Sequence, residues 1–72
     1  MKFALFGQVA LRPDIPEYNL RSGSVGTVVE FYPMPEGQED GYGIEGLIPQ
    51  DTIELSESQI ELIPVSISQA RS

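Results

Sequence analysis

The stretch Leu20–Glu30 constrains the fold of this chain more than any other. It places Gly23 and Gly26 three residues apart, immediately before the run Thr27-Val28-Val29. Glycine permits the tight backbone of a turn, whereas β-branched side chains favour an extended strand. A turn that leads at once into a strand with a glycine near its start is typical of a strongly bent sheet. We therefore expect a small all-β fold.

Turn-forming residues divide the rest of the chain into short strands. The expected strands are 3–11, 25–32, 42–48, 52–55 and 60–64. Pro13 and Pro16 exclude a regular helix or a central strand over residues 12–17, because each proline lacks a backbone donor and restricts its predecessor. We interpret residues 12–24 as a long ordered loop, pinned to the fold by Ile15, Tyr18 and Leu20. The polar segment 56–59 is expected to form one helical turn.

The strand expected at 25–32 carries apolar residues on both of its faces. Strict alternation would place one set of alternate side chains outward and the other set inward. The two sets are Val25, Thr27, Val29 and Phe31 on one face, and Gly26, Val28, Glu30 and Tyr32 on the other. We expect Gly26 to permit a sharp bend or a bulge in this strand.

This order of strands and turns predicts a five-stranded SH3-like barrel with a long first loop and one helical turn before the last strand. An OB-fold is the alternative, although it usually has a longer chain and a helix between two strands. The 72 residues allow one domain. We assign residues 1–65 to the barrel and residues 66–72 to a flexible C-terminal tail.

The residue types that are missing exclude most catalytic chemistry. The chain has no cysteine and no histidine, so disulfides, thiolate metal sites and imidazole bases are excluded. None of its serines has a base to activate it. The acidic cluster Glu36, Glu39 and Asp40 lacks the ligand spacing of a calcium loop and is interpreted as a solvated hairpin tip. We expect no enzyme activity, no cofactor and no metal.

The net charge of −7 restricts the partners of the chain. Only four residues are basic, so a phosphate backbone or an anionic membrane surface would be repelled. A protein partner with a basic surface is favoured instead. The apolar run at the N-terminus stops after Phe6, which is too short for a signal peptide, and no stretch reaches transmembrane length. We expect a cytoplasmic location.

Aromatic and acidic residues near the loops supply a candidate partner-binding site. We predict a patch formed by Tyr18, Tyr32 and Tyr42, with a rim that would select a basic partner. The glutamates expected on this rim are Glu17, Glu30, Glu45 and Glu54. The alternative is that these aromatic residues pack in part of the core, because peptide-binding grooves of SH3 domains usually contain a tryptophan and this chain has none. Four glutamates alternate with apolar neighbours and are expected on the solvent face, where like charges would repel: Glu30, Glu45, Glu54 and Glu61.

Several of these segments carry a family pattern. Gln8–Leu11, Asp14–Glu17 and Gly23–Glu30, followed by Tyr42–Glu45 and Leu55–Leu62, resemble a family of small bacterial proteins described as a domain of unknown function. The resemblance implies an SH3-like, KOW-like barrel and supplies no catalytic residues. Members of the family resemble partners of toxin-like or other small bacterial proteins. Gly43 and Gly46 stand where the family has larger side chains.

The function expected from these observations is a non-catalytic protein-interaction module that binds a protein partner. The alternatives are an antitoxin or immunity-type inhibitor of a neighbouring toxin, and a small structural subunit or assembly factor of a larger complex. A homodimer through an open edge is also possible, with the third and fifth strands as the candidate edges.

Overall fold

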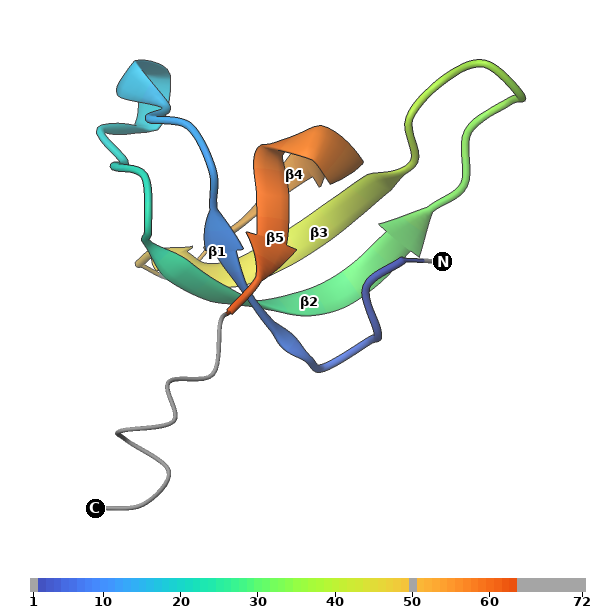
Figure 1. The fold of residues 1–72 in the computed structure, drawn as a ribbon. Helices are drawn as coiled ribbons and strands as arrows, with labels where there is room; N and C mark the ends of the chain where they lie inside the picture. Colours follow the sequence, from blue (N-terminus) through green and yellow to red (C-terminus); the bar gives the residue numbers. More distant parts are fainter. Residues whose placement is uncertain (1, 50, 64–72) are drawn as a thin grey trace.

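A computed structural model describes residues 2–49 and 51–63 of the chain. These residues form one antiparallel sheet and two short 3-10 turns (Figure 1). In chain order the elements are β1 (Gln8–Leu11), η1 (Pro16–Tyr18), β2 (Val25–Tyr32), β3 (Gly41–Ile48), β4 (Asp51–Ser56), η2 (Glu57–Gln59) and β5 (Ile60–Leu62). The all-β fold, the long first loop and the single helical turn before the last strand are therefore confirmed. The predicted tail, 66–72, lies outside the described residues.

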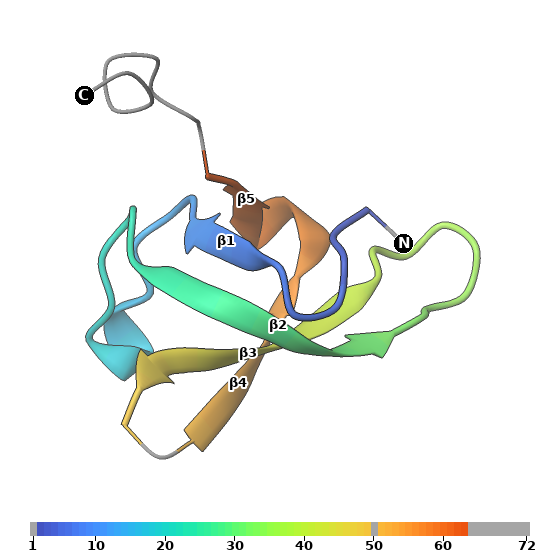
Figure 2. The same cartoon turned by 90° about the horizontal axis from the view of Figure 1, so that it is seen from below.

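The strands follow the order β4-β3-β2-β1-β5. The sheet folds over on itself about the long strand β2, so that β1 and β5 lie on one side of the core and β3 and β4 on the other (Figure 1, Figure 2). β3 pairs with both β2 and β4, which makes it a central strand. Its prediction as a dimerisation edge is wrong, and the edges are β4 and β5. In the described part of the chain, no helix is long and apolar enough to cross a membrane.

The first strand is shorter than predicted. β1 begins at Gln8, and the residues before it form a turn closed by the N–H of Gly7, which donates to the carbonyl of Ala4 at 3.1 Å. Phe3 is nevertheless buried, because the turn brings it back over the end of the core. The long loop 12–24 is anchored by Ile15 and Leu20, which form an isolated bridge, whereas Tyr18 is exposed.

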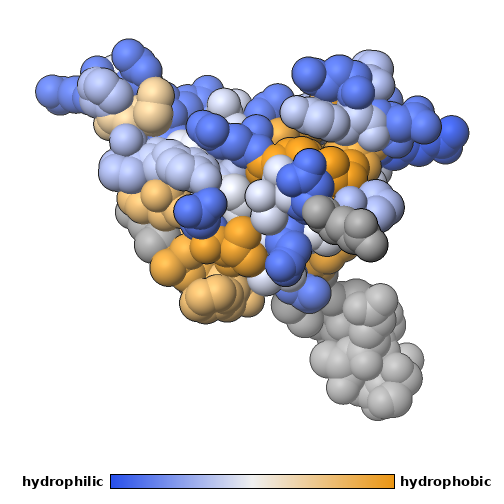
Figure 3. All heavy atoms as spheres, turned by 180° about the vertical axis from the view of Figure 1, so that it is seen from behind, coloured by the Kyte–Doolittle hydropathy of each residue, from blue (hydrophilic) through white to orange (hydrophobic). Residues whose placement is uncertain are grey.

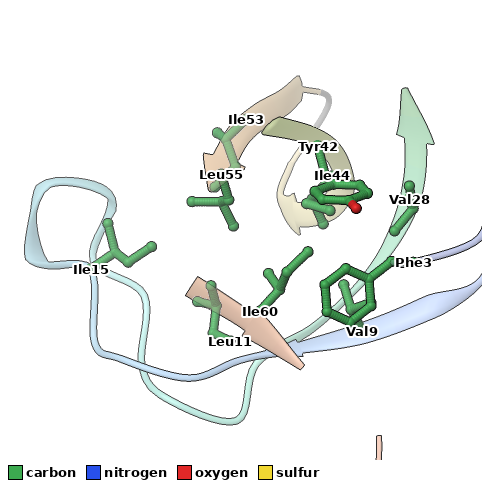
Figure 4. Packing of buried hydrophobic residues seen from close by; sticks show 10 residues of the cluster. All are labelled: Phe3, Val9, Leu11, Ile15, Val28, Tyr42, Ile44, Ile53, Leu55 and Ile60. Atoms are coloured by element: carbon green, nitrogen blue, oxygen red, sulfur yellow. The ribbon is translucent and has the colours of Figure 1, made fainter. Parts of the chain in front are cut away.

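The core fills the space between the two halves of the folded sheet. Its members come from all five strands, from Phe3 and from the first loop (Figure 4): Phe3, Val9, Leu11, Ile15, Val28, Tyr42, Ile44, Ile53, Leu55 and Ile60. The rings of Phe3 and Phe31 each lie 5.3 Å from the Tyr42 ring, centroid to centroid. Tyr42 is thus the aromatic centre of one end of the core.

A bulge in β2 changes which side chains face the core. The register with β3 shifts between Val28 and Glu30, so Val28 opposes Ile44 and Glu30 opposes Gly43. The strict alternation predicted for β2 is therefore wrong beyond Val28. Uninterrupted alternation would bury Glu30 beside Val28 at a high desolvation cost. The extra residue, Val29, turns Glu30 outward and brings Phe31 inward against the core.

At Gly26 there is no room for a side chain between β2 and β3. A Cβ atom at this position would lie 2.4 Å from Cγ2 of Ile44 and 3.0 Å from the carbonyl oxygen of Glu45. A larger residue would fit only if the Ile44 side chain or the neighbouring backbone shifted. The bend expected at Gly26 is thus a close contact between strands, whereas the bulge lies three residues further along the strand.

Candidate functional site

The predicted partner-binding patch is not assembled in the structure. Tyr42 is completely buried, so its assignment to an exposed patch is wrong. Its hydroxyl donates to Oε2 of Glu57 at 2.9 Å and accepts the backbone N–H of Lys2 at 3.0 Å. Burial raises the pKa of Tyr42, and the hydrogen bond to Glu57 also raises it, against a lowering by the Lys2 N–H. Tyr42 is a core residue that also fixes the N-terminal segment and η2.

The remaining members of the patch are divided between the first loop and the sheet. Glu17 and Tyr18 belong to η1, in the loop before β2, whereas Tyr32 is the last residue of β2. Because β2 has 8 residues, its two ends lie about 20 Å apart. Glu45 lies in β3 between these ends, opposite Thr27 of β2. Tyr18 and Tyr32 therefore cannot form one groove, although all four residues remain at the surface, Tyr32 in part.

The structure instead gathers acidic residues on the outer face of β2, β3 and β4. Glu30 of β2 and Glu54 of β4 both oppose Gly43 of β3, one from each side. Glu45 of β3 lies in the next outward row, between Thr27 and Thr52. Three of the four glutamates expected on the solvent face thus share one surface, while Glu61 lies in β5 opposite Ala10. We call Glu30, Glu45, Glu54 and Tyr32 the acidic face.

The glycines of β3 shape this surface. A Cβ at Gly43 would lie 3.1 Å from Cβ of Glu30, and a Cβ at Gly41 would lie 2.9 Å from Oε2 of Glu54. Neighbouring side chains therefore fold over backbone that larger residues would cover. As a result Gly41 and Gly43 are buried although they lie on the outer side of the sheet. Sequence reasoning placed Gly41 in the turn before this strand and treated Gly43 as a residue that weakens it. It did not identify the two glycines as the floor of a surface.

Tyr32 joins the acidic face through a hydrogen bond. Its hydroxyl donates to Oε1 of Glu30 at 2.6 Å. This bond raises the pKa of Tyr32, with smaller contributions from desolvation and from the charges of Glu30 and Glu54. The hydroxyl stays protonated at neutral pH and leaves the charge of Glu30 on the surface. The cluster therefore presents an acceptor-rich, negative surface with one aromatic ring at its edge.

A second acidic group has a structural role. Glu39 of the connector between β2 and β3 accepts the backbone N–H of Ser58 at 2.8 Å and its hydroxyl at 3.1 Å. The neighbouring Asp40 accepts the backbone N–H of Met34 at 2.9 Å. These bonds fasten the connector to η2 and close it at its base. Among residues 2–49 and 51–63, no group of acidic residues is arranged to hold a metal ion.

The chain matches the domain of unknown function DUF4926 over residues 5–45. It belongs to this family. The matched residues include β1, η1, β2 and the first half of β3, so they contain Glu30, Tyr32 and Glu45 of the acidic face. Glu54 lies beyond them. No curated protein and no solved structure matches the chain. The predicted resemblance to a family of unknown function is confirmed, and its continuation over 55–62 stays a prediction.

Proposed function

We propose that this member of the DUF4926 family is a non-catalytic interaction module that binds a basic surface of a protein partner through the acidic face. The observation that carries the proposal is the placement of Glu30 and Glu54 on either side of Gly43, with Glu45 in the adjacent row. The topology is the one we interpret as an SH3-like barrel, a fold that often serves in recognition.

Charge complementarity supports a basic protein as the partner. The chain carries a net charge of −7, and its described basic residues belong to other segments than the acidic face, namely the N-terminal segment (Lys2) and the first loop (Arg12, Arg21). Like charges on neighbouring strands destabilise a sheet. Lysine or arginine from a partner would relieve that repulsion and steer the encounter between the two proteins. A phosphate backbone would instead be repelled.

The proposal is tested by comparing two variants with the same change in net charge. The double variant Glu30→Gln/Glu54→Gln removes two charges from the acidic face. The control, Glu36→Gln/Glu61→Gln, removes two charges from the connector and from β5, and all four residues are exposed. Each tagged protein is used for affinity capture from cells that express it naturally, at low and at high salt.

We expect a partner with a basic surface to be retained by the wild type and the control and lost by the acidic-face variant, with retention falling at high salt. Equal retention by both variants would refute the role of this surface. Where the captured partner is a nuclease, inhibition of its cleavage by the wild-type chain would identify an inhibitor. Unchanged cleavage would identify a structural or docking role.

A further inference from the structure

The turn that precedes β1 presents two large apolar residues at its tip. Its central positions are Leu5, 43% exposed, and Phe6, 75% exposed. Phe6 adopts φ = 68°, a left-handed conformation that normally selects glycine or asparagine. A bulky residue in this conformation costs free energy, and it gains no burial in return. Strained residues that persist on a surface are often retained for a function.

The turn is held rigidly in place. The N–H of Phe6 donates to the carbonyl of Val28 at 2.6 Å, and the N–H of Val28 donates to the carbonyl of Gly7 at 2.9 Å. On the other side of the turn Phe3 is buried against Tyr42. The Phe6 ring is therefore projected from a fixed backbone. A rigid, exposed aromatic side chain loses little conformational entropy when it binds, and such residues dominate the energetics of many interfaces.

The turn borders the acidic face. Val28, which bonds to Phe6 and Gly7, lies two residues from Glu30 along β2 and opposes Ile44 of β3. Viewed from behind, the surface is mixed, with separate groups of apolar residues and hydrophilic residues between them (Figure 3). A partner that covers Glu30 would thus extend readily onto the turn. A second copy of this chain would bring another net charge of −7 to the same place, which argues against self-association.

We propose that Leu5 and Phe6 are the apolar anchor of the interface with the basic partner. The Phe6 ring enters an apolar pocket on that partner, and lysine or arginine residues on the rim of the pocket contact Glu30 and Glu54. This inference rests on the proposed function. It adds the shape and chemistry of the site on the partner, which is a pocket for one aromatic ring with cationic groups around its mouth.

A ring-shaped host molecule with an apolar cavity and a cationic rim provides a defined probe for the proposed site on the partner. β-Cyclodextrin has an apolar cavity that admits one phenyl ring, and its per-amino derivative carries ammonium groups on the rim. Calorimetry would measure the binding of both hosts to the wild type, to Phe6→Ser, to Phe6→Tyr and to Glu30→Gln/Glu54→Gln. Circular dichroism would check that each variant is folded, which is expected because all three altered positions are exposed.

We expect the cationic host to bind the wild type about tenfold more tightly than the neutral host at low salt, and this advantage to vanish at high salt. Phe6→Ser should lose about tenfold in binding to both hosts, whereas Phe6→Tyr should retain it. The variant Glu30→Gln/Glu54→Gln should bind the neutral host as tightly as the wild type does, but it should no longer bind the cationic host more tightly than the neutral one. Equal binding of the wild type and Phe6→Ser would overturn the anchor, and an unchanged cationic advantage in the glutamine variant would overturn its continuity with the acidic face.

The captured partner separates failure of the anchor from failure of the proposed function. If Phe6→Ser still captures the partner that the acidic-face variant loses, the anchor is wrong and the proposed function stands. If the acidic-face variant captures it as well as the wild type does, the proposed function fails. Loss of the partner by both variants, with retention by Phe6→Tyr, supports both proposals.

Discussion

The two faces of β3 differ in what their residues can tolerate. On the inner face Tyr42 and Ile44 are completely buried and surrounded by core side chains. On the outer face Gly41, Gly43 and Glu45 alternate with them, and the carboxylates of neighbouring strands fold over the glycines. Inner atoms have fixed neighbours on every side, whereas outer side chains can move into solvent. The inner face therefore determines the fold, and the outer face is free to carry recognition.

The largest effect is expected from truncating the inner face at Tyr42. Tyr42→Ala removes a ring that contacts both Phe3 and Phe31, and it should lower the free energy of unfolding by about 3–5 kcal/mol. A domain of this size has roughly 4–11 kcal/mol in total, so the variant should be largely unfolded near physiological temperature. Tyr42→Phe keeps the ring and loses only the hydroxyl bonds to Glu57 and Lys2, so about 1 kcal/mol is expected.

Urea denaturation of both variants would measure these differences. Near-equal destabilisation by the two substitutions would show that the hydroxyl network, rather than ring packing, holds this end of the core. If Tyr42→Ala were as stable as the wild type, Tyr42 would not be a core residue, and the contrast between the faces would be removed.

Adding one methyl group to each side of the sheet provides the next comparison. Gly26→Ala places Cβ 2.4 Å from the Ile44 side chain and 3.0 Å from backbone, so the strands must separate, at about 1–3 kcal/mol. Gly41→Ala places Cβ 2.9 Å from Oε2 of Glu54, the far end of a flexible exposed side chain. That carboxylate can move away, so a change within about 0.5 kcal/mol is expected. Thermal unfolding of the two variants would measure both effects. Equal losses of stability in Gly26→Ala and Gly41→Ala would contradict the difference between the faces.

Turn chemistry and alternation predicted most of the inner face but little of the outer one. Strand boundaries followed from Pro33, Gly41 and Pro49, and η2 followed from its polar residues, since these signals are local. A local signal for the bulge at Val29 was missed. Unbroken alternation would bury the charge of Glu30 on the same face as Val28, and the cost of that burial already indicated an interruption between the two residues. Sequence reasoning therefore placed Val29 with Phe31 on one face, which the bulge prevents.

Tyr42 shows a second missed signal, because its alternation with Ile44 already indicated the inner face. Its place beside the connector suggested a surface patch, but the ring is buried, and Lys2 and Glu57 satisfy its hydroxyl inside the fold. The pairing of Glu30 with Glu54 across Gly43 depends on the register of three strands, so no local pattern could predict it. The Leu5-Phe6 turn was likewise unpredictable, because neither residue is typical of a turn and Phe6 occupies a position that favours glycine.

Salt should act on the acidic face more than on other charged positions. Screening weakens the repulsion between Glu30 and Glu54, so the melting temperature of the wild type should rise with added sodium chloride. Glu54→Gln should stabilise the protein at low salt by about 0.2–1 kcal/mol and flatten this rise. The control Glu61→Gln removes the same charge from β5 and should flatten it less. A flat or falling salt curve for the wild type, or equal slopes for both variants, would contradict clustering on the outer face.

The smallest effect is expected from acid titration of Glu39, an exposed carboxylate that contrasts with the half-buried Glu57 beneath Tyr42. Hydrogen bonds from the backbone N–H and hydroxyl of Ser58 lower the pKa of Glu39 from its ordinary value of 4.5. A lowered pKa in the folded state means that these bonds stabilise the protein above pH 4.5 and are lost as the pH falls through the folded-state pKa. Glu39→Gln should therefore melt slightly below the wild type at pH 7.

The difference in melting temperature between Glu39→Gln and the wild type should close as the pH falls below 4.5, the ordinary value for this carboxyl. Glu36→Gln, on the same connector, is the matched control: no hydrogen bond to Glu36 is seen among the described residues, so the pH dependence should match that of the wild type. A difference for Glu39→Gln that stays constant down to pH 3 would show that amide and carboxylate differ in packing at this position and not in charge. The connector would then be held by Asp40 and the backbone of Glu57, whose N–H donates to the Asp40 carbonyl at 3.0 Å whatever the pH.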